Sequence, residues 1–155
     1  MLGAVIGDLG TGSFLADVVA NVNLPAHWLV PILFAMAGLM AFATGSSWGA
    51  FGILLPLAGQ LMNASAGGNE LLIAAFGAVI AGRVFGDHCS PISDTTILSS
   101  TGAGCKVSTH VNTQLPYALV AAGSSLVGYV VFAATGMAPA GFAVTLLVLV
   151  AAALV

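Results

Sequence analysis

The sequence predicts an all-α polytopic membrane protein, and two observations carry this prediction. Hydrophobic residues make up 59% of the 155 positions, whereas charged residues make up only 5%. A soluble surface needs about a quarter of its residues charged, so no ordinary soluble domain fits this composition. The apolar residues also gather in runs long enough to cross, or partly cross, a hydrocarbon core about 30 Å thick. We therefore expect residues 1–155 to form a single transmembrane domain in the lipid bilayer, with no soluble domain.

The few polar residues exclude several classes of function. The net charge of -3 comes from two basic and five acidic residues, too few for a nucleic-acid partner. The two cysteines lack CxxC spacing and are interpreted as free thiols. Together with His88 and His110 they match no closed zinc site, and the glycine triplets lack the lysine of a phosphate loop. We expect no enzyme, no cofactor and no metal beyond a transported ion.

The first half of the chain contains two apolar stretches. Residues 2–22 are expected to be helical, with a break near the glycine-rich GDLGTG. Residues 28–62 are apolar except at TGSSWG, and one helix of that length would exceed the hydrocarbon core. We therefore predict a break at TGSSWG, followed by a half-helix or kinked span at 50–62 that carries Pro56.

The second half contains three further apolar segments, and we predict about six membrane segments in all, two of them broken or re-entrant. Residues 71–85 look too short for a full crossing, whereas 115–135 are long enough. Residues 142–155 form the last segment. The intervening loops are expected at 63–70, 105–114 and 136–141, with Lys106 and His110 facing solvent.

One polar stretch, RVFGDHCSPISDTTILSSTGAG at residues 83–104, interrupts the apolar sequence. Arg83, Asp87, His88 and Asp94 lie within twelve positions of one another, among many hydroxyl side chains. Each ionisable group costs roughly 2.5–3.5 kcal/mol at mid-depth in a membrane, so such groups face a cavity, a partner or a transported ion. This stretch is the predicted working site.

The two interruptions share a composition, because TGSSWG and DTTILSSTGAG both place glycine and hydroxyl residues inside apolar sequence. Paired discontinuous helices indicate a transporter site, since unwound backbone and helix ends can coordinate a cation. Small residues that merely permit close helix packing are the alternative. The predicted broken-helix site consists of Thr44, Gly45, Ser46, Ser47, Trp48 and Gly49.

A carboxylate among hydroxyls can hold either a proton or a sodium ion, and oxygen donors suit such hard cations. Asp94 is the predicted leading carboxylate, because no basic residue lies at helical spacing from it. Asp87 is either an ion ligand or the ion-pair partner of Arg83, four positions earlier. His88 is either a proton carrier or a structural donor. The predicted ion and proton site comprises Asp87, Asp94, Ser93, Thr95, Thr96 and His88.

Three motifs in order carry a family resemblance: FATGSSWGAFGILLPLA at 42–58, FGDHCSPISDTTILSSTGAGC at 85–105 and HVNTQLPYA at 110–118. The chain resembles the later part of the NhaC family of sodium/proton antiporters, which usually has TGTSWGT where this chain has Ser46 and Ala50. The resemblance implies the ion-transporter superfamily fold, exchange of Na+ for H+, and a multi-pass protein of the bacterial inner membrane. Some members exchange malate for lactate, so an organic-anion antiporter is an alternative.

Family members are roughly three times as long as this chain, so the resemblance implies a C-terminal region. Alternating access generally needs two repeats or bundles that move about the site. We therefore expect a separate N-terminal half or a homo-oligomer as partner. A truncated, non-catalytic half is the other possibility that the sequence leaves open.

Overall fold

The computed structural model describes residues 8–10, 14, 17, 25–65 and 67–154, so most of the predicted first segment lies outside the described residues. The described residues form no strand, which confirms the predicted all-α class. A 3-10 turn at Ala26–Trp28 leads into the helices. These are α3 (Leu29–Thr44), α4 (Ser47–Ala64), α5 (Gly68–Cys89), α6 (Asp94–Gly102), α7 (Val107–Thr135) and α8 (Ala138–Ala153).

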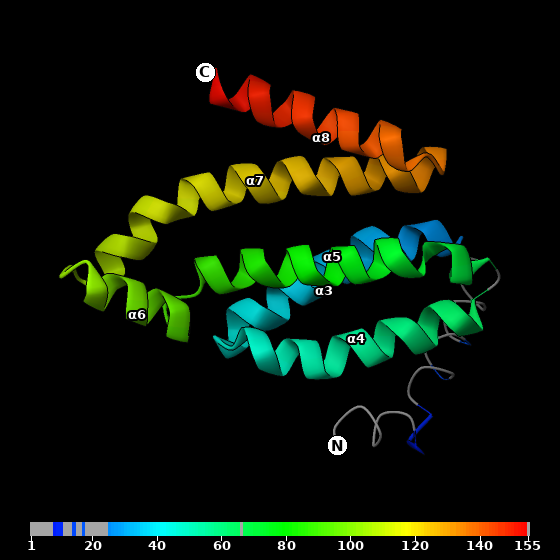
Figure 1. The fold of residues 1–155 in the computed structure, drawn as a ribbon, viewed down its shortest axis with the longest axis horizontal. Coiled ribbons are helices and arrows are strands. Elements are labelled where there is room, and N and C mark those ends of the chain that lie inside the picture. The colour runs from blue at the N-terminus through cyan, green and yellow to red at the C-terminus, as the bar shows by residue number, and fades with distance from the viewer. Residues whose placement is uncertain (1–7, 11–13, 15–16, 18–24, 66, 155) are drawn as a thin grey trace.

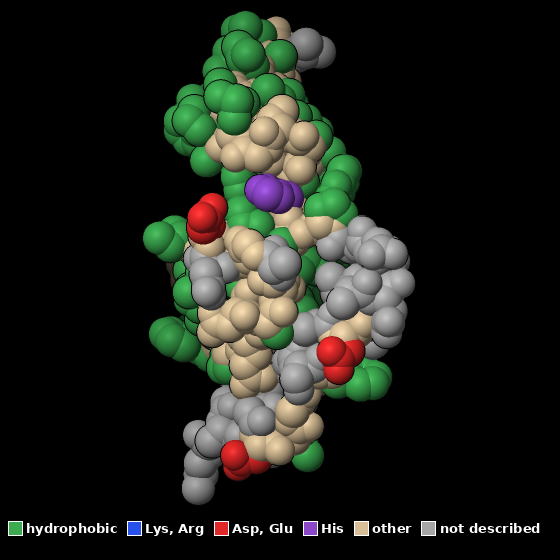
Figure 2. All heavy atoms as spheres, turned by 90° about the vertical axis from the view of Figure 1, so that its right-hand side faces the viewer, with side chains coloured by type: hydrophobic (Ala, Val, Ile, Leu, Met, Phe, Trp, Pro, Cys, Tyr) green, Lys and Arg blue, Asp and Glu red, His purple; other side chains and the backbone are tan. Residues whose placement is uncertain are grey.

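Three of the described helical segments are long and apolar enough to cross a membrane: Ala26–Thr44, Glu70–Cys89 and Val107–Thr135. Two shorter apolar helical segments, Phe51–Ala64 and Ala138–Ala153, accompany them. Figure 2 shows hydrophobic side chains gathered at the top and along the edges of one face, which carries few acidic groups. Apolar helices with so few charges belong in a bilayer, and the chain is a membrane protein.

The predicted break at TGSSWG is confirmed. Gly45 adopts a left-handed conformation with φ 63° and ends α3, while its N–H bonds to the Ala41 carbonyl at 2.9 Å. Glycine pays no Cβ penalty there. Ser46 is extended, and its hydroxyl accepts a bond from the N–H of Gly49 as α4 begins. The helix after the break is longer than predicted, because it runs through Pro56 to Ala64.

Three predicted boundaries were wrong because helices continue into stretches that were predicted as loops. Helix α5 extends beyond 71–85 in both directions and is long enough to cross, so the loop predicted at 63–70 is confined to the few residues between α4 and α5. The stretch 105–114 belongs largely to α7, which places His110 in a helix. Pro139 fits the first turn of α8, so the loop predicted at 136–141 is reduced to Gly136 and Met137.

Helices α3 and α5 lie side by side, with α4 on one side of α5 and α7, then α8, on the other (Figure 1). Gly82 and Gly86 of α5 make the α3 contact close, because a Cβ at either position would collide with the backbone carbonyl of Phe34 or Gly38. Small residues thus bring these two backbones together. The core packed around this contact comes mainly from α3, α4 and α5 and includes Val30, Leu33, Phe34, Leu54, Ala58, Met62, Ala75 and Val79.

Candidate functional site

The second helix break lies between α5 and α6, at residues 90–93. Ser90 is extended and ends α5, as expected for a residue before proline, and Ser93 is extended at the start of α6. Asp87 occupies the last turn of α5, and Thr95 the first turn of α6. The break therefore turns the chain so that the C-terminal end of one helix and the N-terminal end of the next lie beside one carboxylate.

Asp87 is buried, with 5% of its surface exposed, and its carboxylate oxygens contact two hydroxyls. Ser93 Oγ donates to Oδ1 at 2.8 Å, and Thr95 Oγ1 donates to Oδ2 at 2.5 Å. The two hydroxyl oxygens are also 2.8 Å from each other. A buried carboxylate needs such donors, because an unsatisfied charge in an apolar interior is costly.

The proton count of this triangle is informative. Three oxygen–oxygen contacts join Asp87, Ser93 and Thr95, but each hydroxyl supplies only one proton. With Asp87 ionised, both hydroxyl protons point to the carboxylate and the contact between Ser93 and Thr95 has none. A proton on the carboxyl group would supply a donor for the third contact.

A polar cavity of about 190 Å³ adjoins this cluster and is walled by three helices. Space of that size admits several water-sized groups. Its lining residues come from α5, α6 and α7 and are Asp87, His88, Thr95, Thr96, Ser99, His110 and Gln114.

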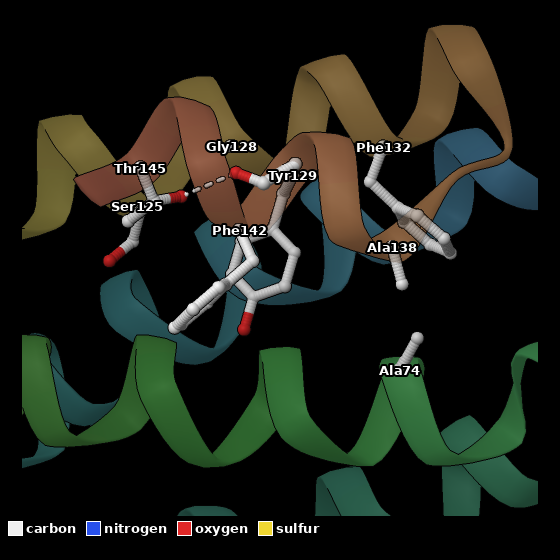
Figure 3. Close-up of a pocket in the computed structure, with 9 residues that line it drawn as sticks. Ala74, Ser125, Gly128, Tyr129, Phe132, Ala138, Phe142 and Thr145 are labelled. Carbon is white, nitrogen blue, oxygen red and sulfur yellow. Dashed lines mark hydrogen bonds between the residues drawn. The ribbon is translucent and has the colours of Figure 1, made fainter. Parts of the chain in front are cut away.

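A cavity of about 250 Å³ between α5, α7 and α8 differs sharply in character. Aromatic and small side chains line it, among them Tyr129, Phe132 and Phe142 (Figure 3). The one hydrogen bond drawn there runs from the Thr145 hydroxyl to the Gly141 carbonyl at 3.0 Å, within α8 itself. Such a cavity offers a cation few oxygens, so the polar cavity beside Asp87 is the candidate site.

Arg83 does not pair with Asp87 among the described residues. Its guanidinium carbon lies 3.3 Å from the centre of the Phe51 ring on α4, a cation–π contact. Its Nε and Nη1 atoms are buried and lack a hydrogen-bond partner within the described part of the chain. Both oxygens of Asp87 contact hydroxyls instead, although the charges of Arg83 and Asp87 still attract each other beyond ion-pair distance.

The predicted site residues divide into two groups in space. Asp87, Ser93, Thr95 and Thr96 are brought together, and His88 lines the same cavity while its Nδ1 lies 2.7 Å from the Val84 carbonyl. Asp94 instead lies exposed in the first turn of α6, where it accepts the Thr95 N–H at 2.9 Å. An exposed carboxylate at that position stabilises the positive end of the helix.

The predicted broken-helix residues 44–49 are not among the described lining residues of the polar cavity. The two breaks nevertheless touch. The Ser90 hydroxyl donates to the Phe42 carbonyl at 2.9 Å, near the end of α3. A Cβ on Gly45 would come within 2.7 Å of Ile92. The first break therefore supports the backbone of the second.

Two lining residues, His110 and Gln114, were absent from the predicted site because their stretch was predicted as a solvent-facing loop. Their spacing of four residues was the available signal, since residues i and i+4 share one face of a helix. In α7 both side chains are half-buried and line the cavity together with residues of α5 and α6.

A buried carboxylate and hydroxyls between the ends of two helices, in an apolar helical membrane protein, are an arrangement typical of transporters. The sequence comparisons give the family. The model of the Na+/H+ antiporter family matches residues 1–134, and the chain belongs to this family. Membership points to a transporter rather than an enzyme.

Three curated relatives illustrate the similarity. An uncharacterized protein of Haemophilus influenzae is 50% identical over 141 residues, which cover 91% of this chain and 27% of that protein. An uncharacterized Na+/H+ antiporter of the same organism is 38% identical over 56% of this chain and 18% of its own length. A malate-2H+/Na+-lactate antiporter of Bacillus subtilis is 32% identical over 74% of this chain and 26% of its own length.

The chain thus spans about a quarter, or less, of the length of these relatives. No solved structure shows a significant match to the chain.

Proposed function

We propose that this chain carries the ion site of a secondary transporter that exchanges Na+ for H+, with Asp87 as the carboxylate that holds either ion. The observation that carries the proposal is the triangle of oxygen–oxygen contacts among Asp87, Ser93 and Thr95, for which the two hydroxyls supply only two protons. In the protonated form, the carboxyl proton supplies the third contact. In the sodium form, the hydroxyl lone pairs and the carboxylate supply oxygens to the ion.

Exchange follows from the charge balance of this arrangement. Ionised Asp87 in a buried position needs a compensating positive charge, and one proton or one sodium ion provides it. Loading one ion therefore releases the other, and an empty buried carboxylate is the costly state. Thr96 lines the same cavity and adds a further oxygen, whereas exposed Asp94 serves as a helix-end charge.

Alternating access requires a second moving unit, and the chain covers only about a quarter of its first relative. We therefore propose that the site works together with the remaining part of a longer transporter or with a second copy. A bacterial inner membrane, multi-pass, is the proposed location, because the bacterial relatives include named antiporters.

The test is pH-driven uptake of radioactive sodium in proteoliposomes that contain the purified chain. We expect uptake that reverses with the direction of the pH gradient and that disappears in Asp87→Asn. Uptake that persists in this variant would overturn the role of Asp87. Absence of uptake from a folded wild-type chain, with uptake once the remaining part of a relative is co-reconstituted, would establish a non-catalytic half that needs its partner.

An organic-anion antiporter is the second candidate, favoured by the name of the Bacillus subtilis relative and by the unpartnered buried nitrogens of Arg83. A guanidinium suits a carboxylate ligand. The same vesicles, loaded with malate and diluted into lactate, separate the candidates. Malate efflux that depends on external lactate and on Arg83 would favour the anion exchanger, whereas sodium uptake without any dicarboxylate favours the cation exchanger.

A further inference from the structure

Helix α7 contributes a free polar group to the cavity beside Asp87. Gln114 is half-buried and lines that cavity. Its carboxamide makes no hydrogen bond within the described part of the chain. Thr96, only 3% exposed, lines the same cavity and its hydroxyl likewise has no partner among the described residues. Both side chains line the cavity beside Asp87 and are therefore free to contact a ligand there.

The geometry of α7 explains why Gln114 lies there. Pro116 lacks an N–H, so the Asn112 carbonyl loses its bond within the helix and the helix can bend. Figure 1 shows the first turns of α7, in yellow, inclined to the rest of the helix and next to α6. Contacts between α6 and α7 hold these turns over the α5–α6 break.

The lining chemistry distinguishes Gln114 from its neighbours. The α5 and α6 wall offers the carboxylate of Asp87, hydroxyls and the ring of His88, whereas His110, the other lining residue of α7, offers ring nitrogens. The carboxamide of Gln114 is therefore the side-chain oxygen donor that α7 contributes among the described lining residues. Hard cations without strong directional preference collect several oxygens, carboxamide carbonyls included.

We propose that Gln114 is a specificity-determining ligand of the transported alkali cation, placed opposite Asp87, and this inference rests on the proposed function. The carbonyl of its carboxamide faces the ion while Asp87, Thr95 and Thr96 supply the other wall. Cation binding then joins α7 to the α5–α6 break, and the distance between the two walls selects the size of the ion. A proton on Asp87 makes no such connection.

The test measures binding without requiring transport. Thermal unfolding of the purified chain in detergent is followed while NaCl replaces choline chloride at constant ionic strength. A ligand that binds the folded state raises the unfolding temperature, and the concentration dependence gives the affinity. We expect stabilisation of the wild type by Na+, its absence in Asp87→Asn, and roughly 10-fold weaker Na+ binding in Gln114→Leu.

Two further variants sharpen the result. Gln114→Glu keeps an oxygen at the same reach and should bind Na+ at least as tightly as the wild type, which guards against misfolding of the leucine variant. Thr113→Val is the matched control, because Thr113 is exposed and its hydroxyl bonds to the Thr109 and His110 carbonyls of its own helix. LiCl and KCl titrations should show a changed preference in Gln114→Leu but not in Thr113→Val.

The outcomes separate the two proposals. Sodium stabilisation that requires Asp87 but is equal in the wild type, Gln114→Leu and Thr113→Val would overturn the role of Gln114 and leave the proposed function standing. A wild-type chain whose stability is the same in NaCl and choline chloride would overturn the proposed sodium site itself.

Discussion

The two helix breaks have similar sequences and different chemistry. At the first, the Thr44 hydroxyl bonds to the Met40 carbonyl and the Ser46 hydroxyl to the Gly49 N–H, so both satisfy nearby backbone. At the second, the Ser93 and Thr95 hydroxyls bond to the carboxylate of Asp87 on the preceding helix. Hydroxyls and glycines suffice to end a helix, whereas an ion site also needs a buried charge within their reach.

The contact between the breaks assigns them separate roles. Ser90 of the second break donates to the Phe42 carbonyl, and Ile92 packs on Gly45 of the first. We therefore propose that the first break supports the backbone of the second, which holds the proposed ion site. Preorganised ligands depend on such support, because a loosely held site loses its geometry.

The largest expected effect separates the two carboxylates of the second break. Asp87→Asn should reduce sodium exchange to the background of empty vesicles, because a neutral amide neither binds a proton nor balances the charge of a sodium ion. Asp94→Asn removes an exposed helix-end charge and should cost less than about 1 kcal/mol of stability while exchange persists. Parallel uptake assays and unfolding curves of the two variants provide the comparison. Equal loss in both would remove the distinction between them.

The support role of the first break is tested at Gly45. Gly45→Ala forces a left-handed alanine and places its Cβ against Ile92, so we expect a loss of about 2–4 kcal/mol in the free energy of unfolding. Gly104→Ala is the matched control, because φ is +66° there but nothing lies within 4 Å of the added Cβ. Denaturant titration in mixed micelles measures both. The same loss at the two positions would mean that contact between the breaks contributes nothing.

The hydrogen bond between the breaks should contribute less to the free energy of unfolding than the backbone conformation and packing at Gly45. Ser90→Ala removes the bond to the Phe42 carbonyl and should lower the free energy of unfolding by about 1 kcal/mol. Ser125→Ala removes only a bond to the Ala121 carbonyl of its own helix and should change stability by about 0.5 kcal/mol or less. Denaturant titrations of the two variants measure both losses. A loss in Ser125→Ala as large as that in Ser90→Ala would mean that the hydrogen bond between the breaks adds no more stability than a bond within one helix.

The smallest expected effect is at Thr44. Thr44→Ala should leave the sodium affinity within about twofold of wild type, since its hydroxyl satisfies the backbone of α3. Ser93→Ala, with a similar change at the second break, should weaken sodium binding clearly because it removes a hydroxyl from Asp87. The thermal-shift titration with NaCl checks both. Comparable weakening in the two variants would place both breaks at the ion.

The sequence alone determined the fold class, the break at Gly45 and the neighbourhood of the working residues. Each follows from local chemistry: apolar runs of membrane length, a glycine that can adopt a positive φ, and a proline that stops a helix after Ser90. The start of α7 was predicted wrongly, because residues 105–114 are polar yet most of them are helical. Propensity is weak there, and packing of α7 on α5 and α6 decides the outcome.

Only the tertiary structure decided which carboxylate is buried. Asp87 and Asp94 both have hydroxyl residues within a few positions, and the one difference in sequence context, Arg83 four positions before Asp87, favoured Asp94 as the leading carboxylate. The turn at residues 90–93 folds Ser93 and Thr95 back onto Asp87 and leaves Asp94 exposed. The same holds for Gln114, which reaches the cavity because α7 packs across the break. Burial depends on contacts between segments far apart in the chain, and no local pattern encodes them.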